Sequence, residues 1–169
     1  MSLQEFRVRH DPIFNPGWRP PRNVKIRHII NETDIPTKDL RAICNFVAPP
    51  GKWHATIRFA NGENSHGNAS LYSCNVWLQR KGHRDWRGPV TWRKGNGYLG
   101  GTVYSRIEAA VYLAAHELRH VQKHQLRGKV RQLRVRGMRK GGRAGNETDC
   151  DRYAIQQLRQ WRRQRLIWP

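Results

Sequence analysis

The segment from Ser105 to Val121 constrains the fold more than any other part of the chain. Ser105 and Glu108 have the spacing of a capping box, in which each side chain accepts a backbone N–H at the start of a helix, so a helix is predicted to begin at Arg106. Apolar residues then recur at helical spacing in two stripes. These are Ile107, Val111, Ala114, Leu118 and Val121, and beside them Ala109, Tyr112 and Leu113. A helix that is apolar on two sides is predicted to lie at the centre of its domain.

This helix carries His116 and His120, with Glu117 between them. Residues four apart project from one face of an α-helix, so the two imidazoles can bind one metal ion. Glu117 projects about 100° away from His116, beside such a metal and not on it. A carboxylate there can accept a proton from zinc-bound water, whose pKa falls to about 7, and pass it to a leaving amine. The motif therefore predicts a hydrolytic zinc site.

A hydrolytic zinc ion takes three protein ligands and leaves one position open, so a further ligand is expected. Downstream, Asn146 is a good N-cap for a second helix. On that helix Glu147 and Asp151 share one face with Cys150, Ala154, Leu158 and Trp161. Carboxylates on a buried face need partners, and a metal ion or a metal-bound histidine is a natural one.

Together the two motifs resemble those of a known family. H-E-x-x-H followed by N-E-x-x-S-D is the mark of gluzincin metallopeptidases, the thermolysin-like branch of the zincins, and this chain has Cys150 in place of the serine. Residues 147–154 also resemble the corresponding helix of small single-domain members such as the ImmA/IrrE-like peptidases. The resemblance covers residues 105–158 and rests on these motifs.

The resemblance implies a ligand set and a role for each residue. One zinc ion per chain is expected, bound by His116, His120 and Glu147, with Glu117 as the general base. Asp151 is expected to orient a zinc-binding histidine through the second ring nitrogen. His124 is the competing ligand by spacing, but three residues on one straight helix surround a tetrahedral metal poorly.

The oxyanion-stabilising group of larger gluzincins lies beyond the glutamate helix, as a histidine or tyrosine. Residues 159–169 contain neither residue type. Such a group would therefore come from upstream, where Tyr98, Tyr104, His83 and the arginines are candidates, although an ordinary core or surface role is favoured for each.

The upstream sequence predicts strands around one short helix. Alternating apolar residues predict strands in segments 24–30, 53–59 and 72–78, with a Gly/Asn/Ser-rich turn between the last two. Thr37 is predicted to cap a helix that ends before Pro49, and residues 90–104 form a predicted hairpin around residues 94–97. The predicted fold class is α+β, a minimal zincin-like metallopeptidase domain. A small, mostly antiparallel sheet would pack on the central helix, beside the helix that carries Glu147.

The chain has 169 residues, of which 37% are hydrophobic, which is enough for one domain, residues 1–169, with a core of its own. Residues 1–22 contain four prolines and are predicted to form an irregular arm. In zincin folds the strand before the histidine helix borders the cleft, so a substrate-binding edge is expected within residues 90–104.

Charge is the second strong signal, with a formal net charge of +20. Every charged residue from Arg119 to Arg143 is Lys or Arg, and residues 127–145 are predicted to form a basic helix extension or loop between the zinc ligands, flexible from Gly137 to Gly145. Such an excess predicts a polyanion partner, namely nucleic acid bound without sequence specificity. The candidate residues are Arg127, Lys129, Arg131, Arg134, Arg136, Arg139, Lys140 and Arg143. Arginines at positions 152, 159, 162, 163 and 165 add a second basic face.

The sequence indicates an intracellular, cytoplasmic protein. The longest apolar run, residues 109–115, is too short to cross a bilayer, and the N-terminus has no hydrophobic signal region. The three cysteines are widely spaced, which indicates neither a disulfide framework nor a zinc ribbon.

Two classes of function remain. The first is a zinc metallopeptidase that hydrolyses a protein or peptide on or near nucleic acid. The alternative is a basic nucleic-acid-binding protein with a structural or vestigial metal site. Glu117 favours the first, because a structural site has no use for a general base. A zinc nuclease is a weaker third possibility, since one zinc ion with these ligands suits amide hydrolysis better.

Overall fold

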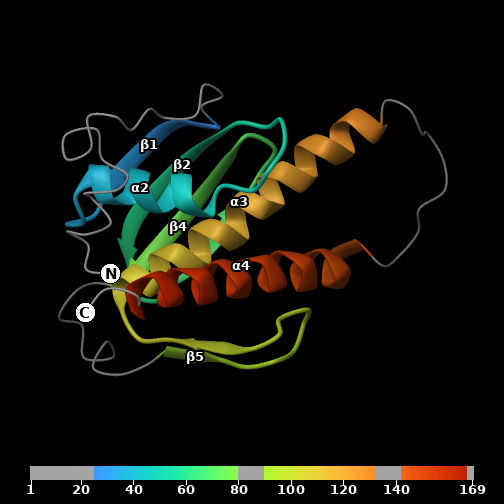
Figure 1. Cartoon of the computed structure of the whole chain (residues 1–169). Coiled ribbons are helices and arrows are strands. Elements are labelled where there is room, and N and C mark those ends of the chain that lie inside the picture. Colours follow the sequence, from blue (N-terminus) through green and yellow to red (C-terminus); the bar gives the residue numbers. More distant parts are fainter. Residues whose placement is uncertain (1–24, 80–89, 132–141, 167–169) are drawn as a thin grey trace.

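A computed structural model describes residues 25–79, 90–131 and 142–166 of the chain (Figure 1). Within these ranges the fold is mixed α+β, as predicted, with three helices, a four-stranded sheet and a separate hairpin. The strands are β1 (Ile26–Glu32), β2 (Ala55–Gly62), β3 (His66–Ala69), β4 (Ser73–Gln79), β5 (Val90–Trp92) and β6 (Gly101–Val103). The helices are α2 (Thr37–Val47), α3 (Arg106–Arg131) and α4 (Gly142–Leu166).

The four-stranded sheet has the order β1-β2-β4-β3. β1 runs parallel to β2, with Ile29 opposite Ile57, and β2 runs parallel to β4, with Ile57 opposite Cys74. β3 alone is antiparallel, against β4. The prediction of a mostly antiparallel sheet was therefore wrong. For β1 and β2 the reason is that β1, α2 and β2 form a crossover unit, in which the helix returns the chain to the end where the first strand began. β2 and β4 are parallel because β3 returns the chain between them and β4 then pairs with both.

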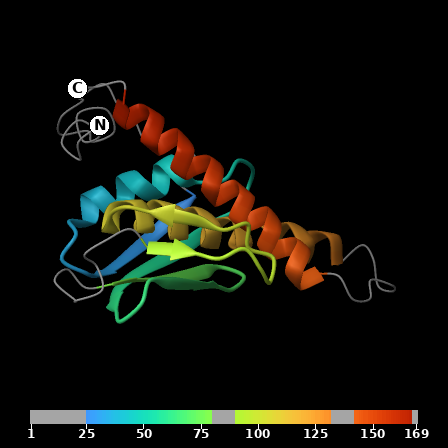
Figure 2. The ribbon, with the colours of Figure 1, turned by 90° about the horizontal axis from the view of Figure 1, so that it is seen from below.

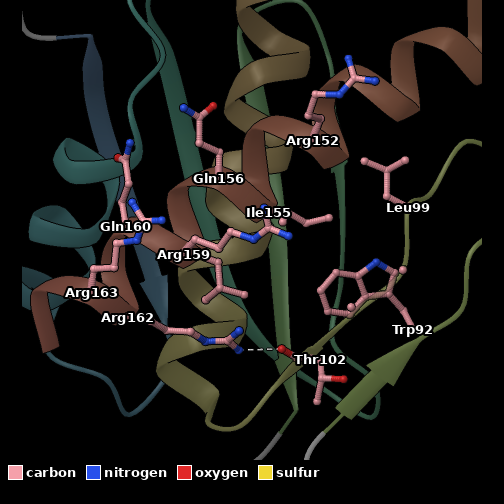
Figure 3. A pocket seen from close by; sticks show the side chains of 13 residues that line it. Trp92, Leu99, Thr102, Arg152, Ile155, Gln156, Arg159, Gln160, Arg162 and Arg163 are labelled. Atoms are coloured by element: carbon pink, nitrogen blue, oxygen red, sulfur yellow. Dashed lines mark hydrogen bonds between the residues drawn. The ribbon is translucent and has the colours of Figure 1, made fainter. Parts of the chain in front are cut away.

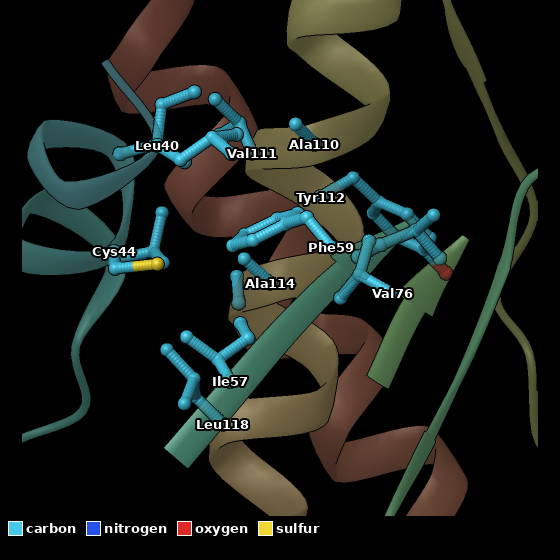
Figure 4. Packing of buried hydrophobic residues seen from close by; sticks show 14 of the residues in the cluster. Leu40, Cys44, Ile57, Phe59, Val76, Ala110, Val111, Tyr112, Ala114 and Leu118 are labelled. Atoms are coloured by element: carbon cyan, nitrogen blue, oxygen red, sulfur yellow. The ribbon is translucent and has the colours of Figure 1, made fainter. Parts of the chain in front are cut away.

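The core lies between this sheet and the helices α2 and α3 (Figure 4). Alternate residues of β2 and β4 face it and are almost completely buried, as the alternating pattern predicted. These are Ala55, Ile57, Phe59, Cys74, Val76 and Leu78. Helix α2 contributes Leu40, Ile43, Cys44 and Val47.

Helix α3 occupies the central position that its two apolar stripes predicted. It contacts β3 and β4 of the sheet on one side and α4 on the other (Figure 2). Its start is also as predicted, at Arg106. The Glu108 N–H donates to Ser105 Oγ at 3.1 Å, while Glu108 Oε2 accepts the N–H of Tyr104 at 2.8 Å.

Two helix starts differ from prediction. Thr37 is the first residue of α2 and not its cap; Pro36 holds the N-cap position without a side-chain hydrogen bond. Helix α4 begins at Gly142, so Asn146 lies inside it and residues 142–145 are helical, where a flexible loop was predicted. From Glu147 onward the apolar face of α4 packs along α3, and tertiary contacts of this kind supply most helix stability.

The predicted hairpin is present as β5 and β6, apart from the main sheet. Its connection contains Asn96 with φ 50° and Gly95 and Gly97 with φ 150° and 93°, the left-handed backbone that Asn and Gly tolerate. Trp92 of β5 packs on Tyr112 of α3, with ring centroids 4.3 Å apart. The predicted arm, residues 1–22, lies outside the described residues. Among the described helices, none has the length and apolar character needed to cross a membrane.

Candidate metal centre

Three side chains from two helices meet where α3 packs on α4. Nε2 of His116 lies 3.1 Å from Nε2 of His120 and 3.1 Å from Oε2 of Glu147. Nε2 of His120 lies 3.3 Å from the same carboxylate oxygen. Both histidines are buried, with exposed fractions of 3% and 7%. The two predicted motifs, which are separated by a long basic segment in the sequence, therefore come together in the fold.

These distances fit a tetrahedral zinc site. With zinc bonds of about 2.0–2.2 Å, adjacent ligand atoms of a tetrahedron lie about 3.3 Å apart. All three atoms are metal-ligand types that zinc accepts, and they converge on one point. Among the described residues, no other group of three His, Cys, Asp or Glu side chains is arranged in this way.

Burial keeps both imidazoles in the neutral form that binds a metal. It lowers the pKa of His116, although Glu147 and Asp151 act in the opposite direction. Burial, followed by the neighbouring His116, lowers the pKa of His120 to about 4. At neutral pH each imidazole therefore has one ring nitrogen without a proton, as metal binding requires.

Glu117 lies beside the three ligands, in contact with strand β3. Its exposed fraction is 5%, and burial, followed by the charge of Glu147, raises its pKa to about 8. A Cβ atom on Gly67 would lie 2.6 Å from Cγ and Oε1 of Glu117, so the backbone of β3 approaches this carboxylate as closely as only glycine allows. A buried carboxyl group with a raised pKa that borders a candidate metal site is a candidate for acid–base chemistry.

Asp151 holds three parts of the fold together behind His116. Its carboxylate is fully buried; Oδ1 accepts the hydroxyl of Tyr112, and Oδ2 accepts the N–H of Leu99 at 2.6 Å. Oδ1 also lies on the Nδ1 side of His116, but at 4.0 Å, beyond a direct hydrogen bond. Nδ1 of His116 has no hydrogen-bond partner among the described residues. The expected orienting contact is thus close to, but not within, hydrogen-bond distance.

Tyr98 is the upstream candidate that adjoins the cluster. Its ring stacks on His116 with centroids 5.7 Å apart and planes 13° apart, and its hydroxyl interacts with Glu147. Burial, followed by the charge of Glu147, raises the pKa of Tyr98, so the phenol keeps its proton. Tyr104 is 64% exposed and lies under the guanidinium of Arg162, away from the cluster. His83 lies outside the described residues.

His124 does not join the metal ligands. Its Nδ1 lies 3.2 Å from the carbonyl oxygen of Ser70, and its ring centroid is 6.0 Å from that of His120. Two cations of α3 instead hold the start of the metal-binding part of α4. Arg119 and Lys123 donate to Oδ2 of Asp149 at 3.1 and 2.8 Å. The sequence placed both cations in the basic segment from Arg119 to Arg143 and did not predict that they pair with Asp149.

The expected substrate edge within residues 90–104 stays a prediction, and the structure places a second strand beside the cluster. The main-sheet strand next to Glu117 is β3, which lies at the edge of the sheet and contacts α3. The β5–β6 hairpin borders the other side of the cluster through Tyr98 and Leu99. β3 escaped prediction because its four residues, His-Gly-Asn-Ala, show no apolar alternation.

The residues predicted to bind nucleic acid are only partly within the described chain. Arg127, Lys129 and Arg131 belong to the last turns of α3, and Arg143 to the first turn of α4. Arg134, Arg136, Arg139 and Lys140 lie outside the described residues.

Comparisons of the chain with protein-family models, with curated proteins and with solved structures found no match.

Proposed function

We propose that the protein is a zinc-dependent metallopeptidase of the gluzincin type, acting on a protein or peptide on or near nucleic acid. The observation that carries the proposal is the convergence of two imidazole nitrogens and one carboxylate oxygen, 3.1 to 3.3 Å apart, beside the buried Glu117. Three ligands leave one tetrahedral position for water or substrate, which distinguishes catalytic from structural zinc sites.

Each neighbouring side chain has a role in this proposal. Bound zinc would lower the pKa of a water molecule to about 7 and polarise the substrate carbonyl. Glu117 would take a proton from the attacking water and deliver it to the leaving amine. Tyr98, which keeps its phenolic proton, would donate a hydrogen bond to the carbonyl oxygen as negative charge develops there. Asp151 would fix the position of the Tyr98–Leu99 backbone, and its carboxylate would face the Nδ1 side of His116 at 4.0 Å.

Strand β3 would supply the binding surface for an extended peptide. It is an edge strand of the sheet, and a peptide can add to such an edge through main-chain hydrogen bonds. The close approach of Gly67 to Glu117 would bring a peptide bound there to the general base.

An intracellular setting belongs to the same proposal. Cys44, Cys74 and Cys150 are free and buried, which suits a reducing compartment. The alternative function, a basic nucleic-acid-binding protein with a structural metal, is favoured by the net charge of +20. This alternative assigns no role to the buried carboxylate of Glu117 beside the three candidate ligands.

Metal analysis of the purified protein tests the proposal first. One zinc per chain is expected in the wild type, with loss of zinc in His116→Ala, His120→Ala and Glu147→Ala. His124→Ala is the matched control on the same helix and should keep its zinc. A wild-type protein that binds no zinc after metal reconstitution would contradict the proposal.

Activity then separates the two functions. Glu117→Gln should retain zinc but lose cleavage of a casein or mixed-peptide substrate, because the amide cannot accept the proton of the water. The same variant, with a photoreactive group, can trap a bound substrate for identification. Equal cleavage by wild type and Glu117→Gln would assign the hydrolysis to a contaminant and leave the alternative function.

A further inference from the structure

A second site lies on the other side of α4 from the metal ligands. Helix α4 and the β5–β6 hairpin enclose a groove of about 650 Å³ (Figure 3). Its apolar part is formed by Trp92 and Leu99 of the hairpin and by Ile155 of α4. The groove is distinct from the metal cluster, although Leu99 contributes to both, through its side chain here and its N–H on Asp151 there.

The groove is lined by cations that have no acidic neighbours in it. Arg152, Arg159, Arg162 and Arg163 contribute to its wall, and among the residues that the structure describes no Asp or Glu does. Arg162 is already engaged, with hydrogen bonds to both oxygens of Glu108 and to the carbonyl of Thr102 (Figure 3). The other three are exposed, and within the described part of the chain no carboxylate pairs with them.

The three exposed arginines form a row along one face of the helix. Arg152, Arg159 and Arg163 stand at i, i+7 and i+11, which gives successive rises of about 10 and 6 Å along the axis. Exposed glutamines at positions 156 and 160 lie in the same row and add neutral hydrogen-bonding groups. Three like charges held in a row repel one another, and a partner with negative charges at intervals removes that repulsion.

We propose that this groove binds the phosphate backbone of a nucleic acid. One guanidinium group can bind two oxygens of a phosphate at once. A row of arginines can therefore follow successive phosphates of one strand. The apolar part of the groove would contact sugars or base faces. Nothing in the groove is arranged for reading base edges, so binding is independent of sequence. The site lies on α4 and the hairpin, apart from the basic segment between the zinc ligands, and it requires neither zinc nor peptidase activity.

Fluorescence anisotropy with a labelled oligothymidylate tests this assignment. The variant Arg152→Gln/Arg159→Gln/Arg163→Gln removes the row. The matched control Arg27→Gln/Arg41→Gln/Lys52→Gln removes the same charge from exposed positions on β1, on α2 and near α2. The circular dichroism and melting temperature of each variant establish that it is folded. A labelled oligoribonucleotide and a labelled duplex, run in parallel, identify the kind of strand that the groove prefers.

The expected difference is in the salt dependence. Loss of three phosphate contacts should reduce the magnitude of the slope of log affinity against log salt by about 2. Between about 50 and about 200 mM salt, the affinity of the variant should therefore fall by a factor about 20 times smaller than that of the wild type. The control variant should keep the wild-type slope. Equal loss in both variants would overturn the proposal, because net charge alone would then explain binding.

Two further outcomes also overturn it. One is full loss of binding on neutralising Arg127, Arg131, Arg134 and Arg139 with no effect of the groove variant, which would place the nucleic acid on that segment. The other is displacement of the oligonucleotide by polyglutamate at the same charge concentration, which would indicate an acidic protein partner. Zinc content, measured in the same samples, keeps this test separate from the peptidase proposal.

Discussion

Gly67 has a strong local effect on the candidate site, because the space left by its missing side chain is filled by Glu117. The backbone at this position is extended within β3, so conformational freedom is not the reason for a glycine. The reason is contact distance, since any Cβ here would lie 2.6 Å from Cγ and Oε1 of Glu117.

Gly67→Ala should therefore displace Glu117 or β3. We expect peptide cleavage to fall about 100-fold, the loss typical of misplacing a catalytic group by about 1 Å, while zinc is retained. The free energy of unfolding should fall by about 1–3 kcal/mol through overpacking. Steady-state kinetics and urea denaturation measure the two effects. Asn68→Ala is the control on the same strand; a similar loss of cleavage there would mean that the strand as a whole, and not the contact, was responsible.

Tyr98 is the second residue whose role can be isolated. Tyr98→Phe keeps the ring stacked on His116 but removes the hydroxyl, so kcat should fall about 10²–10³-fold with little change in KM or zinc content. The control is Tyr104→Phe, which removes a hydroxyl from an exposed ring away from the cluster. An unchanged kcat in Tyr98→Phe would remove this tyrosine from the proposed mechanism.

At the scale of elements, the docking of α4 on α3 determines whether the site exists. Besides the His116–His120–Glu147 cluster, two ion pairs fasten α4 to α3. Asp149, in the first half of α4, pairs with Arg119 and Lys123, and Arg162, near its end, pairs with Glu108 at the start of α3. Arg162 also donates to the carbonyl of Thr102 at 2.6 Å and so attaches the hairpin to the same helix.

Arg162→Met tests this attachment. The change removes the Arg162 guanidinium from the carboxylate of Glu108, which is 3% exposed, and should reduce the free energy of unfolding by about 2 kcal/mol. Chemical denaturation followed by tryptophan fluorescence measures it. Arg163→Met, at the next and exposed position, should change stability by less than about 0.5 kcal/mol. Equal effects of the two changes would contradict a specific role for the Arg162–Glu108 pair.

The elements that the sequence predicted well are those specified by local patterns. The capping box at Ser105 located the start of α3, and residues at helical spacing identified the buried face that carries Glu147. Parallel pairing of β1 and β2 was also within reach, because a strand, a helix and a strand in succession indicate a crossover unit. The sequence could not predict β3 or the contacts of Asp151 with Tyr112 and Leu99, because these depend on which distant segments meet in the fold.

For the whole molecule, a zinc ion would act as a cross-link between two helices that are far apart in the sequence. Ligands that assemble only in the folded state make metal binding contribute to folding stability. In the proposed holoprotein, the α3–α4 contact would then be stabilised both by apolar packing and by coordination.

Removal of zinc should consequently lower the melting temperature. At a free zinc concentration 100 times the Kd, the bound ion contributes about 2.7 kcal/mol to the folded state. Calorimetry with and without a chelator measures this difference, and re-addition of zinc should reverse it. Glu147→Ala, which lacks one ligand, should respond much less to the chelator. A wild-type melting temperature that does not change with chelator would indicate that no metal links the helices.

The position of α4 between the metal cluster and the arginine groove has a consequence for the choice of target. An α-helix with its side chains is only about 10–12 Å across, and Arg152 follows Glu147 by a rise of about 7.5 Å. If both proposals hold, the thickness of α4 sets the distance between a bound nucleic-acid strand and the peptide bond that is cleaved. Proteins already seated on the same strand would be cut in loops that reach around one helix, while free proteins in solution would meet the zinc only by chance.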